Sequence, residues 1–282
     1  MDIDSIIQKF RDFFERKKTW PFIKEAARVL TYKTKAGYKI IHYLTATAIF
    51  MFVLIFGFIV FSFFNCFGAV NSLNAISPIT IFFFFISIIA VSFILSPFFS
   101  GYYLMVYKDI FGNLDSDFSD FLFFIHSLDK NKKNFLVESF IVCFLNLFLL
   151  SIFVIVSIGF ISFLLKFIPP IPVINFILAF VVKVVISVIS LTFILPILPI
   201  SFILITKVNE RFFINPKGDE KNIEIRNVID VILKSFKLYF SNFSVILING
   251  FILAIGFITL VGNLVSFPLG GLGLIIALRK KM

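Results

Sequence analysis

Residues 40–64 read IIHYLTATAIFMFVLIFGFIVFSFF and contain no Asp, Glu, Lys or Arg. At about 1.5 Å per residue, a helix of this length exceeds the roughly 30 Å hydrocarbon layer of a bilayer. Backbone groups that cross lipid must bond within their own segment, so the run predicts a transmembrane helix. The whole chain agrees, with 60% hydrophobic residues, 15% charged residues and a mean hydropathy of +1.04. This composition excludes an ordinary soluble domain.

Further apolar runs follow, and turn-forming residues separate some of them. A Pro-rich segment at 166–172 cannot remain helical, and Gly262-Asn263 is a turn-forming pair. We therefore predict an all-α polytopic integral membrane protein, with six transmembrane helices in three hairpins and a cytoplasmic amphipathic segment at 1–39. The six spans are predicted at 40–64, 75–107, 135–165, 174–206, 243–261 and 263–278. The last is short, because sixteen residues give only about 24 Å of helix.

Basic residues gather in four places along the chain. Of the 26 Lys and Arg residues, all but Lys166 and Lys183 lie in 1–39, in 108–134, in 207–242 or after residue 278. Cytoplasmic connections collect Lys and Arg, whereas short translocated loops do not. We therefore expect both termini in the cytoplasm. Acidic residues are interspersed among the first basic ones, which argues against a signal or transit peptide and favours a bacterial inner membrane.

The formal net charge of +10 and the pI near 9.6 would suggest nucleic acid as the partner of a soluble protein. Here the cations stand beside apolar spans and among acidic residues, so nucleic acid is not expected. The predicted partners are membrane lipids, with anionic headgroups at the cytoplasmic face. Alternatively, these Lys and Arg residues only set the orientation of the protein in the membrane and bind no particular lipid.

A Pro recurs eleven residues before the first basic residue that follows the second, fourth and sixth predicted spans. The pairs are Pro97 with Lys108, Pro196 with Lys207, and Pro268 with Arg279. Eleven helical residues rise about 16 Å, so each Pro is expected near the middle of the bilayer. Ser96 and Ser266 directly precede their prolines and are candidate donors to the carbonyl that each Pro leaves unbonded. Pro97, Gly101, Pro196 and Pro268 either shape a packed bundle or act as hinges around a substrate path.

Amphipathic stretches precede the first, third and fifth spans. Apolar residues recur at helical spacing between Ile3 and Phe14, and again at 229–236. The second stripe is repeated 108 residues earlier, at 121–128. Such helices lie flat at a membrane surface, so we expect interfacial elbow helices that can also bind a membrane-protein partner. An Asn at the junction with the next span, such as Asn242, is expected to be a helix cap.

Three short motifs give the chain a resemblance to a known family over most of 40–282. They are Pro97-Phe-Phe-Ser-Gly101, the elbow from Ser235 to Asn242, and Pro268-Leu-Gly-Gly271. The chain resembles a bacterial family of six-helix inner-membrane proteins related to the membrane domain fused to some glycerophosphodiester phosphodiesterases. The resemblance implies the fold, although Ile200 stands where analogy with Gly101 would place a Gly. The chain has no phosphodiesterase domain, so that activity is not implied.

Three polar residues in the apolar runs are candidate ligand or pathway residues: Asn146, Glu138 and Lys183. Asn146 is deep enough to bond across helices, and a structural bond of this kind is the alternative to a ligand role. Glu138 lies four residues into the third span, where Lys132 or Lys133 can pair with it. Lys183 is expected at the outer interface, where a long side chain reaches water.

No residues are spaced for a catalytic or metal site. His42 and His126 have no Cys or paired carboxylate at ligand spacing, and no cofactor-binding motif is present. We therefore expect neither a metal nor a cofactor, and enzymatic activity is not expected. The favoured function is transport or handling of a lipid or lipophilic substrate. The alternative is a non-catalytic scaffold or assembly factor that binds other membrane proteins.

Overall fold

The fold is helical throughout the described part of the chain, apart from one two-residue strand pair. The computed structural model describes residues 3–16, 20–34, 37–70, 78–112, 116–123, 130–165, 192, 195–210, 225–258 and 260–282. Its helices are α1 (Ile3–Arg16), α2 (Pro21–Leu30), α3 (Lys39–Val70), α4 (Pro78–Ile110), α5 (Phe118–Phe121), α7 (Lys130–Leu165), α9 (Ile197–Val208), α11 (Ile225–Ser241), α12 (Phe243–Ile258) and α13 (Leu260–Leu278). Strands β1 (Lys33–Thr34) and β2 (Gly37–Tyr38) pair in antiparallel fashion before α3.

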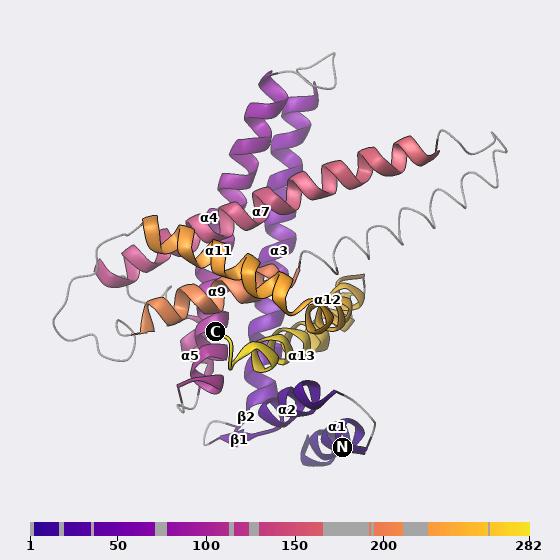
Figure 1. Cartoon of the computed structure of the whole chain (residues 1–282), viewed down its shortest axis with the longest axis vertical. Helices are drawn as coiled ribbons and strands as arrows, with labels where there is room; N and C mark the ends of the chain where they lie inside the picture. Colours follow the sequence, from indigo (N-terminus) through magenta and orange to yellow (C-terminus); the bar gives the residue numbers. More distant parts are fainter. Residues whose placement is uncertain are drawn as a thin grey trace.

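Helices α3 and α4 form a long hairpin, and α7 crosses it at an angle (Figure 1). Both helices of the hairpin are somewhat displaced from the predicted spans, since α3 covers 39–70 and α4 covers 78–110. Pro97 lies inside α4 without ending it. The charged ends of α3 and α4 lie together, beside α5 and the strand pair.

Three helices among the described residues are long and apolar enough to cross a membrane. They are Lys39–Phe63, Pro78–Ile110 and Lys132–Ile152, and one bent helix pair makes a fourth candidate. The described residues therefore support a membrane protein but do not reach the predicted count of six spans. Helix α9 has 12 residues and α12 has 16, too few for a layer of roughly 30 Å. Most of the predicted fourth span lies outside the described residues.

The turn predicted at Gly262-Asn263 was placed wrongly. Both residues lie inside α13, which begins at Leu260, whereas α12 ends at Ile258. Gly and Asn are tolerated inside a helix, so this dipeptide is a weak turn signal and α13 continues through it. At 19 residues, α13 is about 28 Å long rather than the 24 Å expected.

The amphipathic helix predicted before the fifth span is present, and the chain bends sharply where it ends. The amphipathic α11 meets α12 at a bend of 99°. At the bend, Asn242 Nδ2 donates to the Leu238 carbonyl at 2.8 Å and so caps the end of α11. Ile229, Leu233 and Phe240 remain largely exposed on α11. Of the earlier elbow, the structure shows the short α5 and the start of α7, whereas residues 124–129 lie outside the described part.

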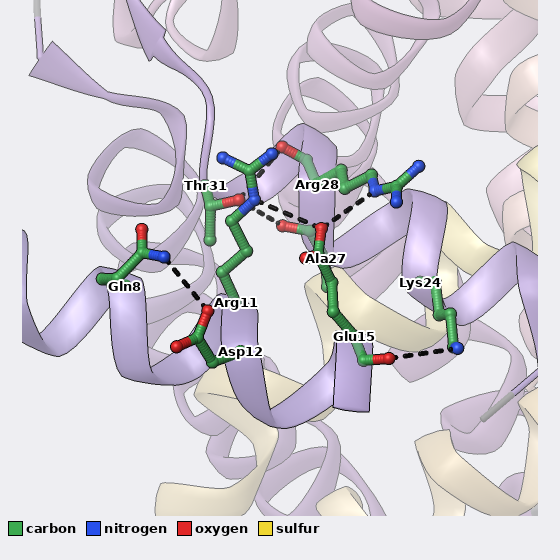
Figure 2. Close-up of polar contacts among 8 residues, drawn as sticks. All are labelled: Gln8, Arg11, Asp12, Glu15, Lys24, Ala27, Arg28 and Thr31. Carbon is green, nitrogen blue, oxygen red and sulfur yellow. Dashed lines mark hydrogen bonds and ion pairs between the residues drawn. The ribbon is translucent and has the colours of Figure 1, made fainter. Parts of the chain in front are cut away.

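The N-terminal amphipathic helix α1 is tied to α2 through Glu15 (Figure 2). The Glu15 carboxylate accepts hydrogen bonds from Arg28 Nε at 3.2 Å and from Arg11 Nε at 3.4 Å. Lys24 Nζ donates to the Glu15 carbonyl at 3.3 Å. The guanidinium group of Arg28, and to a smaller extent that of Arg11, lowers the pKa of the Glu15 carboxyl group. Helix α2 in turn packs on α13, so this segment joins the body of the protein.

Candidate functional site

An apolar cavity of about 80 Å³ lies between helices α3, α4, α7, α12, α13 and the start of α9. Each of its twelve lining side chains is apolar. They are Phe50, Met51, Leu54, Leu95, Phe99, Leu147, Leu150, Leu195, Leu198, Pro199, Leu253 and Phe267. A cavity of this kind stays dry and takes apolar guests, because water would find no hydrogen-bond partner there.

The three recurring prolines all lie next to residues that line this cavity. Leu95 and Phe99 stand two residues on either side of Pro97, Leu195 directly precedes Pro196, and Phe267 directly precedes Pro268. The structure therefore brings together three segments that the sequence relates only by their spacing to a cation. Pro97 and Pro268 lie inside continuous helices, whereas Pro196 is the residue before the first turn of α9.

Local backbone bonding differs between two of the prolines. Pro97 has no N–H to offer the Phe93 carbonyl, and Ser96 Oγ donates to that carbonyl at 3.5 Å, as the sequence predicts. Ser266 was expected to do the same at Pro268. Its hydroxyl is buried and has no hydrogen-bond partner among the described residues, so that expectation was wrong.

Aromatic rings form one wall of the cavity. Phe50 lies edge-on to Phe99, with ring centroids 4.6 Å apart, and is stacked on Phe267 at 5.3 Å. Phe99 is also stacked on Phe202 at 4.9 Å. Contacts of this kind hold rings in fixed relative positions beyond what burial alone does. The rest of the lining consists of Leu side chains, Pro199 and Met51, and Met is the most adaptable of these side chains.

Size limits what the cavity can hold. A site of roughly 150 Å³ admits benzene, and a water molecule occupies about 30 Å³ in the liquid. At about 80 Å³ the cavity takes the end of an alkyl chain and not a whole lipid. A larger guest requires the Leu side chains or the proline-bearing helices to move apart.

Gly101 has a packing role that the hinge hypothesis did not include. A Cβ at this position would lie 2.0 Å from the Phe121 carbonyl oxygen, so the backbone of α5 approaches α4 more closely than any other residue would allow. Gly250 is similar, since its Cβ would lie 2.0 Å from the Thr192 carbonyl oxygen. Both glycines permit close backbone contact, which is the small-residue packing that membrane helices use.

A buried polar network joins the charged ends of α3 and α4, and the sequence did not predict it. The fully buried Asp109 carboxylate pairs with Lys39 and accepts hydrogen bonds from Tyr43 at 2.9 Å and Ser116 at 2.8 Å. Next to it, Lys108 pairs with Asp120 of α5. The sequence feature that could have indicated this network is Asp109, an acidic residue that directly follows Lys108 at the end of an apolar run. Its main partner stands 70 residues away, so spacing alone could not reveal it.

The polar candidates from the sequence do not converge on the cavity. Asn146 is buried, but its Nδ2 donates to the Val142 carbonyl of its own helix at 2.8 Å. Glu138 is fully buried and accepts a hydrogen bond at 3.1 Å from Asn209, just past the end of α9. Neither residue lines the apolar cavity. Lys183 lies outside the described residues.

Comparison of the chain with protein-family models finds no match, and searches of curated proteins and of solved structures find none. The class of protein therefore follows from the fold itself. Three helices that are long and apolar enough to cross a bilayer indicate a helical membrane protein. Its further assignment depends on the chemistry of the cavity.

Proposed function

We propose that this membrane protein binds a lipophilic molecule and handles or transports it, with an alkyl chain entering the apolar cavity between the proline-bearing helices. The observation that carries the proposal is the lining: six chain segments contribute twelve apolar side chains to one cavity. A packed bundle needs no such space, because protein interiors fill gaps larger than a water molecule.

The proposal includes the six-span topology in a bacterial inner membrane, with both termini in the cytoplasm. It is supported by the grouping of cations at one end of the α3–α4 hairpin and around α11. Cysteine accessibility tests this topology. A Cys introduced at Val70 should react only from the side opposite the termini, and labelling from the cytoplasm contradicts the model.

A photoreactive fatty acid in lipid nanodiscs tests the cavity directly. Residues labelled by the probe are identified by mass spectrometry, and Phe99 and Leu198 should be among them. Leu147→Trp fills the cavity from α7 and should abolish that labelling. The matched control is Leu149→Trp, because Leu149 is exposed on the same helix two residues away.

Two results would reject lipophile binding. One is labelling confined to bilayer-facing residues such as Phe93, which is 73% exposed. The other is equal labelling of the cavity in the Leu147→Trp and Leu149→Trp variants. Mass spectrometry of protein purified in native lipid adds an independent test. Recovery of a stoichiometric protein partner with no enriched lipid or solute would favour the scaffold role instead.

A further inference from the structure

A second cavity, of about 300 Å³, lies between the end of α9, the first half of α11 and the C-terminal residue. Its lining differs from that of the apolar cavity, because it combines Lys207, Lys234, Asp230 and Asn227 with apolar residues from α9 and α11. Pockets that bind small molecules begin at about this volume and pair an apolar lining with a few polar groups.

The two cavities lie on opposite faces of α9. Leu198 lines the apolar cavity and Lys207 lines the second one, and nine helical residues at about 100° each place them on opposite sides of the helix. The second cavity is therefore a separate site. Binding at this site does not depend on the proposed binding of a lipophile in the apolar cavity.

Side chains of both charge signs line the second cavity among the described residues. Asp230 and Lys234 stand four residues apart on α11, a spacing at which such side chains often pair. Among the described residues no ion pair joins them, and Lys234 Nζ instead donates to the Met282 backbone oxygen at 3.2 Å. Lys207 lies with its ammonium group 5.5 Å from the centre of the Phe111 ring. Among the described residues that line the pocket, one side-chain carboxylate and two side-chain ammonium groups are therefore available, and that of Lys234 also bonds to Met282.

We infer that this cavity binds a zwitterionic phosphate ester of the phosphoethanolamine type. Lys207 and Lys234 bind the phosphate as point charges, and Asn227 can donate a further hydrogen bond. Asp230 binds the ligand's ammonium group. A purely anionic ligand would meet repulsion from Asp230, and a simple cation would meet repulsion from both Lys residues. The apolar side chains of Leu204 and Val208 lie against the carbon backbone of the ester.

Calorimetric titration of the full chain in nanodiscs with glycerophosphoethanolamine and with glycerophosphoglycerol tests the inference. The Lys207→Gln/Lys234→Gln variant should bind both esters about tenfold more weakly, because it loses two charge-assisted contacts. Asp230→Asn should weaken binding of the ethanolamine ester alone and leave or improve binding of the glycerol ester. Lys237→Gln is the matched control, since Lys237 is exposed on α11 and does not line the cavity.

Native mass spectrometry distinguishes a membrane lipid from a soluble phosphate ester as the natural ligand. If the ligand is a membrane lipid, phosphatidylethanolamine should be retained over phosphatidylglycerol, and Asp230→Asn should remove that preference. If the source is soluble, the glycerophosphoethanolamine titration gives binding without lipid retention. Absence of binding in both experiments, or equal effects of Asp230→Asn on both esters, overturns the inference. Labelling by the photoreactive fatty acid should be unchanged in all these variants, so failure here is distinct from failure of the apolar cavity.

Discussion

Replacing Gly101 by Ala should destabilise the contact between α4 and α5. The new Cβ would lie 2.0 Å from the Phe121 carbonyl oxygen, and side chains need at least 3.0 Å, so the α5 backbone must move by about that difference. Movement is restricted because Phe121 is fully buried and Asp120 pairs with Lys108. Overpacking of this kind costs about 1–3 kcal/mol.

The expected melting temperature follows from that cost. For chains of roughly this size, 1 kcal/mol corresponds to about 2–4 °C, so Gly101→Ala should melt about 2–12 °C below the parent. A thiol-reactive fluorophore can follow unfolding, because Cys143 is fully buried and becomes reactive when the fold opens. The measurement uses a Cys66→Ser background, so that Cys143 alone reports.

Gly271→Ala is the matched control, since a Cβ there meets no atom within 4 Å. It should melt at or slightly above the temperature of the parent, because Ala favours a helix over Gly. A Gly101→Ala variant that melts within a degree of the parent would refute the close approach of α5 to α4. So would an equal loss in both variants.

Two further predictions concern ionised groups. Asp109→Ala removes the carboxylate that pairs with the buried Lys39 ammonium, which should cost about 3–5 kcal/mol, and Lys39→Met/Asp109→Leu should recover much of that loss in the same melting assay. A double variant that melts below the single one contradicts this view of the network. The second prediction is that α1 should separate from α2 at acid pH. The pKa of Glu15 is lowered by Arg28 and Arg11, so their attraction is complete above the ordinary value of 4.5 and is lost as pH falls through the lowered one. Spin-label distances between the two helices should lengthen over that range, and a similar acid response in Arg28→Gln would count against the role of Glu15.

Much of the secondary structure could be predicted from the sequence, because lipid imposes simple rules on it. Apolar length identified α3, α4 and α7, and amphipathic spacing identified α1 and α11. Asn242 was correctly expected to be a cap. The turn predicted at Gly262-Asn263 was wrong because a single Gly-Asn pair is a weak turn signal that a helix can contain. Strands β1 and β2 were not predicted, because a strand of two residues is too short to show an alternating hydrophobic pattern.

Only part of the candidate site could be predicted from the sequence. The sequence shows the recurrence of Pro97, Pro196 and Pro268, but nothing in their spacing indicated an apolar cavity beside them. Asn146 and Glu138 attracted attention because polar groups are costly in lipid. In the fold their side chains hydrogen-bond to Val142 and Asn209 and do not line the cavity.

From the sequence alone we could infer that lipid surrounds this protein, that its secondary structure is helical and where most of its long helices lie. These properties depend on composition and on hydrophobic periods of a few residues. Only the tertiary structure decided that Asp109 pairs with Lys39, that Gly101 receives the backbone of α5, and that two cavities of different chemistry lie on opposite faces of α9. Each of these joins residues far apart in the chain. Their meeting depends on helix crossing and rotation, which are set by packing among all the helices together.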